Sequence, residues 1–133
     1  MNLLRRCSGI ISLVAMLVLT TGAVVLAQKG TSIVTRIKFA RGRTTTVERG
    51  SVHRGMSHDY LLKASAGQTM SVHLAARGGV TFEVVTPDEK YVVTHDVKDW
   101  SDELQQSGDY RINVLPDTTT ERSISYTLEV TVR

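Results

Sequence analysis

The residues from Ile124 to Val132 alternate strictly between apolar and polar side chains. The apolar positions are Ile124, Tyr126, Leu128, Val130 and Val132. Successive side chains of an extended strand point to opposite faces, so this segment has one apolar face and one polar face. An apolar face of this kind is stable only when it packs against another layer. The segment therefore predicts a strand in a sheet that buries one side.

The same alternation recurs in short runs along most of the chain. These runs are Ile33–Phe39, Thr44–Val52, His58–Ala64, Met70–Leu74, Val80–Val84, Tyr91–Val97 and Tyr110–Val114. Turn-forming residues separate them, as at Pro87-Asp88-Glu89-Lys90, and only Asp99–Gln106 has room for a helical turn. Short alternating runs between turn signals are typical of two packed antiparallel sheets. The sequence predicts an all-β fold, an antiparallel β-sandwich of about seven to eight strands.

The first 27 residues have a different character. Arg5 and Arg6 precede an acid-free apolar stretch from Ile10 to Leu26, and small residues lead to a plausible cut before Gln28. This pattern is typical of a secretory signal peptide, which forms an apolar helix in the membrane. The alternative is an uncleaved membrane anchor, because the run approaches the ~20 residues that span a bilayer. We expect a signal peptide over residues 1–27 and a single β-sandwich domain over residues 28–133.

The composition of residues 28–133 limits their chemistry. Cys7, the only cysteine, lies in the leader, so the domain has no disulfide, zinc–thiolate site or cysteine nucleophile. Without the two leader arginines, 14 basic and 13 acidic side chains remain, a net charge of +1 with neutral histidines. This balance argues against nucleic-acid binding, which depends on many uncompensated cationic contacts.

Catalytic motifs are missing from the sequence. Ser57-His58-Asp59 contains the residue types of a catalytic triad, but neighbours in an extended segment point to opposite faces. The four histidines, His53, His58, His73 and His95, lie in separate segments, and we expect them on the solvated surface. The acid pairs Asp88/Glu89 and Asp102/Glu103 are expected in solvent. The sequence assigns no catalytic residue, metal ligand or cofactor, and we expect no enzymatic activity; an enzyme would need such side chains to converge in one pocket.

Two further features have alternative interpretations. The basic run Arg36, Lys38, Arg41 and Arg43 is expected to form a solvated strand face, and the alternative is contact with an anionic surface. Trp100, the only tryptophan, is expected to plug one end of the sandwich, and the alternative is an anchor at an interface.

Most of the chain resembles a known family. The segment from Asp59 to Leu74 resembles the centre of bacterial pre-peptidase C-terminal-type β-sandwich domains, and more closely that of the periplasmic inhibitors of g-type lysozyme. Arg36–Gly42 is similar to the opening strand of that group, and Tyr126–Leu128 to its last strand. Trp100, Leu104 and then Ser107-Gly108-Asp109-Tyr110 are similar to its C-terminal half. The resemblance implies a β-sandwich from about Arg36 to Val132.

The resemblance also implies a partner-binding loop. In several lysozyme-inhibitor families a Ser-Gly-x-Tyr motif marks the loop that enters the enzyme's cleft, and it falls here on Ser107, Gly108 and Tyr110. The alternative is a plain β-turn, with Tyr110 as the first inward residue of a strand. The family's arginine-rich loop corresponds to Leu115–Ser123, which holds one arginine and two acids here. Arg111 and Arg122 remain as candidates for contacts with acidic groups of a partner.

These inferences predict an exported protein-binding module in the periplasm or outside the cell. The implied partner is g-type lysozyme or another cell-wall hydrolase, blocked at its muramidase cleft. No nucleic-acid partner is expected, and membrane contact is expected only through an uncleaved leader. The alternative function is a non-enzymatic carbohydrate- or cell-envelope-binding β-sandwich.

Overall fold

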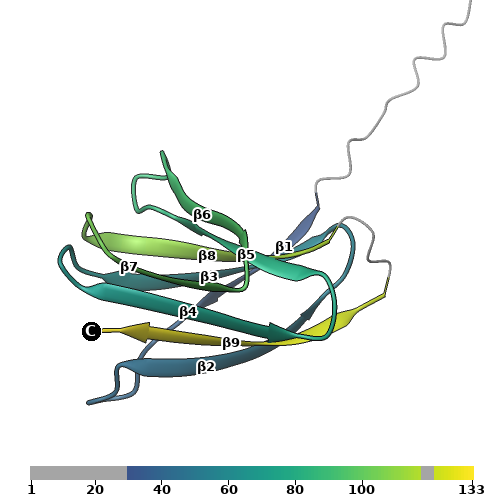
Figure 1. The fold of residues 1–133 in the computed structure, drawn as a ribbon, viewed down its shortest axis with the longest axis horizontal. Coiled ribbons are helices and arrows are strands. Elements are labelled where there is room, and N and C mark those ends of the chain that lie inside the picture. The colour runs from purple at the N-terminus through teal and green to yellow at the C-terminus, as the bar shows by residue number, and fades with distance from the viewer. Residues whose placement is uncertain (1–29, 118–121) are drawn as a thin grey trace, which may run out of the picture.

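Two β-sheets packed face to face make up the computed structural model, which describes residues 30–117 and 122–133 (Figure 1). The predicted leader, residues 1–27, lies outside the described residues. No helix occurs among the described residues, and hence none that is long and apolar enough to cross a membrane. The predicted all-β sandwich is confirmed.

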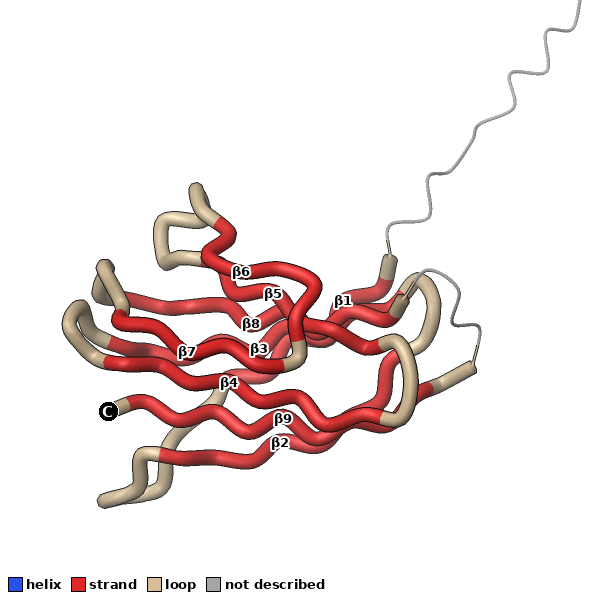
Figure 2. Tube along the Cα trace, in the orientation of Figure 1, coloured by secondary structure: helices blue, strands red, loops and turns tan. Residues whose placement is uncertain are grey.

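Nine strands form the described part of the sandwich (Figure 2). They are β1 (Thr31–Arg36), β2 (Thr45–Val52), β3 (Met56–Ala64), β4 (Thr69–Ala76), β5 (Val80–Val85), β6 (Val92–Val97), β7 (Asp99–Glu103), β8 (Gly108–Pro116) and β9 (Ile124–Val132). One sheet has the order β1-β3-β8-β5-β6 and the other the order β2-β9-β4-β7. Only the β5–β6 connection joins neighbours in one sheet. Every other connection crosses from one layer to the other.

Three details differ from the predicted architecture. The segment Asp99–Gln106 holds no helical turn: β7 occupies its first half and pairs with the edge of β4. This strand brings the total to nine rather than seven or eight. The pairing is antiparallel throughout except between β1 and β3, which run parallel. A parallel neighbour is possible here because β2 returns the chain through the opposite sheet before β3 begins.

The core consists of the inward side chains of both sheets, as the alternation predicts. The five-stranded sheet contributes Tyr60, Leu62, Phe82, Val84, Tyr110, Ile112 and Val114, all at most 2% exposed. The four-stranded sheet contributes Met70, Val72, Leu74, Leu128 and Val130. Trp100 is half-buried on β7 and packs against this cluster. Burial of these apolar surfaces is the main favourable term in folding.

A polar cluster interrupts the core between the two sheets. Tyr60 Oη on β3 lies 2.7 Å from Tyr126 Oη on β9. The ring of His58 stacks on Tyr60 at a centroid distance of 4.2 Å. Its Nδ1 lies 2.8 Å from Tyr126 Oη, and its Nε2 lies 2.8 Å from Thr35 Oγ1. The expectation of a solvated His58 is therefore wrong, because its inward position on β3 places it among these hydroxyls. His53, His73 and His95 are exposed.

The cluster makes stability depend on pH. Burial lowers the pKa of His58 below 6.5, and the charges of Asp59 and Glu48 oppose this effect. The unfolded chain then takes up a proton more readily than the folded protein. The stabilising contribution is complete above pH 6.5 and is lost as the pH falls through the lowered pKa of the folded state.

We predict that the free energy of unfolding decreases between about pH 7.5 and about pH 5.5. Urea titrations of the wild type and of His58→Gln measure this effect. The variant should lose most of the pH dependence, whereas His53→Gln, at an exposed site, should keep it. Equal pH dependence in wild type and His58→Gln would assign the effect to other groups.

Candidate functional site

Three connections meet at one end of the sandwich. They are residues 65–68 between β3 and β4, residues 86–91 between β5 and β6, and residues 104–109, which join β7 to β8 and include the first two residues of β8. These three segments together are called the loop surface. Gly67 N–H donates to Leu104 O at 2.8 Å, and Leu104 N–H donates to Gln68 O at 2.7 Å. Gln106 Nε2 donates to Asp88 Oδ2 at 3.4 Å. Each connection thus forms hydrogen bonds with another, and the three together make one ordered surface at this end of the sandwich.

The predicted Ser-Gly turn lies in the middle of this surface. Ser107 is exposed, and its Oγ accepts a hydrogen bond from Ala66 N–H at 2.8 Å. Gly108 has a φ of 139°, a conformation that side chains disfavour. A Cβ added at Gly108 would lie 2.9 Å from Pro87 Cβ, so the glycine also allows the β5–β6 loop to approach. The turn is held in place from both sides.

Tyr110 does not present its ring to a partner. Its side chain is 2% exposed, on the inward face of β8. The hydroxyl donates to Gln106 O at 2.7 Å and accepts from Gln106 N–H at 3.2 Å. This corrects the interpretation of Tyr110 as a contact residue. Its place in the core follows from the alternation, and its hydroxyl fixes the loop from beneath.

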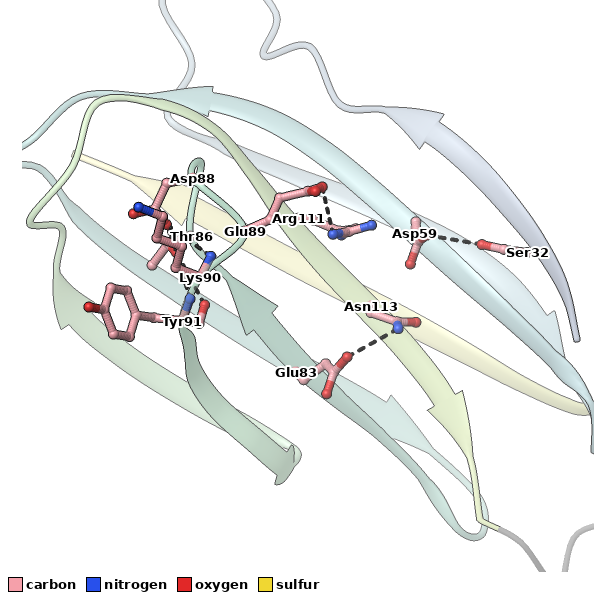
Figure 3. A network of polar contacts seen from close by, with 10 residues as sticks. All are labelled: Ser32, Asp59, Glu83, Thr86, Asp88, Glu89, Lys90, Tyr91, Arg111 and Asn113. Atoms are coloured by element: carbon pink, nitrogen blue, oxygen red, sulfur yellow. Dashed lines mark hydrogen bonds and ion pairs between the residues drawn. The ribbon is translucent and has the colours of Figure 1, made fainter. Parts of the chain in front are cut away.

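The β5–β6 loop is organised by a network of polar contacts (Figure 3). Thr86 Oγ1 donates to Asp88 Oδ1 at 2.6 Å, and Lys90 N–H donates to the same oxygen at 3.1 Å. These hydrogen bonds, the first above all, lower the pKa of Asp88. Glu89 at the tip has a φ of 58°. Its carboxylate lies 2.8 Å from Arg111 Nη2 (Figure 3), so the loop is also tied to β8.

Arg36 and Arg111, two arginines beside the loop surface, already have acidic partners. Arg36 on β1 forms a two-point ion pair with Asp109, with N···O distances of 2.9 and 2.8 Å. The hydrogen bonds of this pair raise the pKa of Arg36 and lower that of Asp109. Arg111 pairs with Glu89. Arg36 is therefore not part of a purely cationic strand face, and Arg111 reaches a partner only while sharing or releasing Glu89.

Arg122 lies at the other end of the molecule. It follows β8, whereas Ser107 precedes it, and the nine residues of β8 separate the two ends. A strand of that length spans about 30 Å. The structure therefore brings together Ser107, Gly108 and Arg111 but not Arg122. Residues 118–121 of the predicted Leu115–Ser123 loop lie outside the described residues.

A polar row crosses the outer face of the five-stranded sheet beside Arg111. Asp59 on β3 pairs in register with Asn113 on β8, which pairs with Glu83 on β5. Ser32 Oγ donates to Asp59 Oδ2 at 2.9 Å, and Asn113 Nδ2 donates to Glu83 Oε1 at 3.2 Å (Figure 3). Asp59 Oδ1 and Asn113 Oδ1 are buried and have no hydrogen-bond partner within the described part. Sequence reasoning missed this row, because nothing in single strands shows which polar positions lie side by side.

No group of three His, Cys, Asp or Glu residues gathers to hold a metal ion within residues 30–117 and 122–133. Asp88, Glu89, Asp102 and Glu103 are all exposed. Ser57, His58 and Asp59 point to alternate faces of β3, as expected for a strand. Hydrogen-bonding groups and shape are what the loop surface offers a partner.

Comparison with solved structures decides which known fold this is. PliG of Aeromonas hydrophila, a periplasmic lysozyme inhibitor of g-type lysozyme, superposes with a TM-score of 0.70 at 23% identity, over 77% of this chain and 98% of its own. PliG of Salmonella Typhimurium superposes with a TM-score of 0.65 at 17% identity, over 77% of this chain and 100% of its own. The chain has the fold of these inhibitors. A mutant of the Escherichia coli PliG superposes with a TM-score of 0.62 at 16% identity, over 77% of this chain and 99% of its own.

The predicted resemblance is thus confirmed at the level of the fold. These PliG structures are described as inhibitors of g-type lysozyme and not as enzymes. No protein-family model matches the chain, and no curated protein matches it either.

The polar row gives a prediction about stability. Replacing Asp59 by Asn keeps an oxygen to accept from Ser32 and supplies an N–H that can donate to Asn113 Oδ1. Asp59→Asn should therefore raise the free energy of unfolding by about 1 kcal/mol, measured by urea denaturation. Asp59→Ala, which supplies no donor and loses the contact with Ser32, should give no gain. A loss of stability in Asp59→Asn would mean that the Asp59 oxygen is already satisfied.

Proposed function

We propose that this protein is an exported, non-enzymatic inhibitor of a g-type lysozyme or a related cell-wall hydrolase. The loop surface, centred on Ser107 and Gly108, inserts into the cleft of that enzyme. A periplasmic location accompanies this proposal, because the similar PliG structures are described as periplasmic and the leader has a signal-peptide pattern.

The observation that carries the proposal is the fixed shape of the loop surface. Ser107 is tied to Ala66, Gly108 packs against Pro87, and Tyr110 holds the backbone of Gln106 from the core. A loop that is already ordered loses little conformational entropy when it binds. A small hydroxyl side chain next to a glycine also makes a narrow projection, which suits a cleft shaped for a saccharide chain.

Arg111 supplies the charge contact in this proposal. Glycoside hydrolases act through a pair of carboxyl groups in their cleft, so a cation beside the inserted loop is attracted to it. Arg111 is half-buried, and its hydrogen bond to Glu89 Oε1 leaves other N–H groups of the guanidinium available. Asp109 and Glu89 lie close by and reduce this attraction, so the geometry favours specific contact over long-range steering.

An inhibition assay against g-, c- and i-type lysozymes tests the proposal. We expect the purified protein to inhibit g-type lysozyme at micromolar concentration. Arg111→Ala should weaken inhibition by about tenfold or more, since a charge-assisted contact is lost. Glu89→Gln should strengthen it, because it releases the guanidinium from a competing carboxylate.

Two further variants separate binding from folding. Ser107→Ala should weaken inhibition while lowering the free energy of unfolding by only about 1 kcal/mol, because Ala66 N–H stays open to water. Lys98→Ala removes an exposed cation that donates to Gly78 O at the opposite end, and it should leave inhibition unchanged. Failure of the wild type to inhibit any of the three lysozymes would refute the proposal.

A further inference from the structure

The outer face of the four-stranded sheet carries a broad hollow of about 960 Å³. We call it the sheet hollow; it lies over β9 between Arg49 on β2 and Arg77, which follows β4. Thr127 on β9 pairs in register with Arg49 on one side and with Ala75 on the other. Since neighbouring strands lie about 4.8 Å apart, β2 and β4 are separated by about 10 Å. That is wide enough to seat a sugar ring along β9.

The floor of the hollow is made of small hydroxyl side chains. Ser51 on β2 and Ser125 on β9 are paired in register, and their Oγ atoms lie 3.2 Å apart. Thr127 adds a further hydroxyl to the floor along β9, and the small side chain of Ala75 on β4 leaves space beside it. Each hydroxyl has one donor and two acceptor sites, so one mutual hydrogen bond leaves capacity for a ligand. Such a floor matches the hydroxyl groups of a saccharide.

The two walls are cationic. Arg49 and Arg77 are exposed, and no carboxylate of the described residues forms an ion pair with either of them. This sets them apart from Arg36 and Arg111, which are both paired. A guanidinium presents N–H groups in a planar fork that matches a carboxylate. Two such groups beside a hydroxyl floor form a site for an anionic, hydroxyl-rich molecule.

The length of that molecule is limited by the next stretch of the same sheet face. Glu129, His73 and Asp99 lie in adjacent register positions across β9, β4 and β7. His73 Nδ1 is in hydrogen-bond contact with Asp99 Oδ1. The carboxylates of Asp99 and Glu129 are both exposed. A long polyanion along β9 would meet these carboxylates and be repelled. The hollow therefore suits a short saccharide with its acidic group near the arginines.

We propose that the sheet hollow binds a short carboxylate-bearing saccharide, with Arg49 and Arg77 contacting the carboxylate and the hydroxyls of Ser125 and Thr127 contacting the sugar. This inference goes beyond lysozyme inhibition and does not rest on it. The hollow lies towards the β4–β5 and β8–β9 connections, at the end of the sandwich opposite to the loop surface.

Isothermal titration with 3′-sialyllactose, a trisaccharide with a single carboxylate, tests the proposal. We expect saturable binding that weakens at high salt, and a loss of affinity of about tenfold in Arg49→Ala and in Arg77→Ala. Maltotriose, a neutral trisaccharide, and acetate, a carboxylate without a sugar, should each bind at least about tenfold more weakly. Arg43→Ala is the matched control, because Arg43 is an exposed arginine in the β1–β2 connection, and it should bind as the wild type does.

Three outcomes would overturn the inference. They are no binding of 3′-sialyllactose, equal binding by the wild type and the Arg49→Ala/Arg77→Ala double variant, and an equal loss of affinity in Arg43→Ala. Thermal unfolding of each variant excludes misfolding as the cause of a loss. Lysozyme inhibition by the double variant should equal that of the wild type, so the two proposals fail or succeed separately.

Discussion

The burial of alternate side chains between the two sheets is the interaction on which the rest of the structure depends. Because the chain crosses between the layers at every connection except β5–β6, neither sheet is completed without the other. The same crossings gather the connections at the ends of the sandwich. The loop surface is a consequence: its three segments leave strands of both layers and meet over the end of one shared core. The loop surface is therefore ordered by contacts with the core, above all by the hydrogen bond from the Tyr110 hydroxyl to Gln106 O.

The polar cluster of the core fixes how the sheets face each other. Burying a hydroxyl is costly unless it is hydrogen-bonded, and Tyr60 and Tyr126 satisfy one another across the sheets, with His58 as a third member. Gly50 makes room for this arrangement, because a Cβ there would lie 2.5 Å from Tyr126 Oη. A shift of one sheet against the other would leave these groups unpaired. The cluster thus adds specificity to an interface that is otherwise apolar.

Local sequence patterns predicted the strands and inward side chains that depend on burial. They did not predict contacts that depend on the register between strands. The strands that bury every second residue, β9 most clearly, were predictable from alternation, and so was the inward position of Tyr110. The edge strand β7 was not, because only Trp100 among its five residues is partly buried. The ion pair of Arg36 with Asp109 joins positions 73 residues apart, and no spacing along the chain indicates it. The same holds for the opposite placement of Ser107 and Arg122.

Pairing of charges gives the two proposed surfaces different physical behaviour. At the loop surface Arg36 and Arg111 each face a carboxylate of the same chain, so their attraction of an anion at a distance is weak. Binding there depends on shape and on short hydrogen bonds made after water is expelled, that of Arg111 included. In the sheet hollow Arg49 and Arg77 have no such partner among the described residues, so attraction of an anion begins at a distance and is screened by salt. A change of ionic strength should therefore alter saccharide binding strongly and lysozyme inhibition weakly. This difference follows from charge placement alone, and it links the near-neutral net charge of the domain to two distinct modes of recognition.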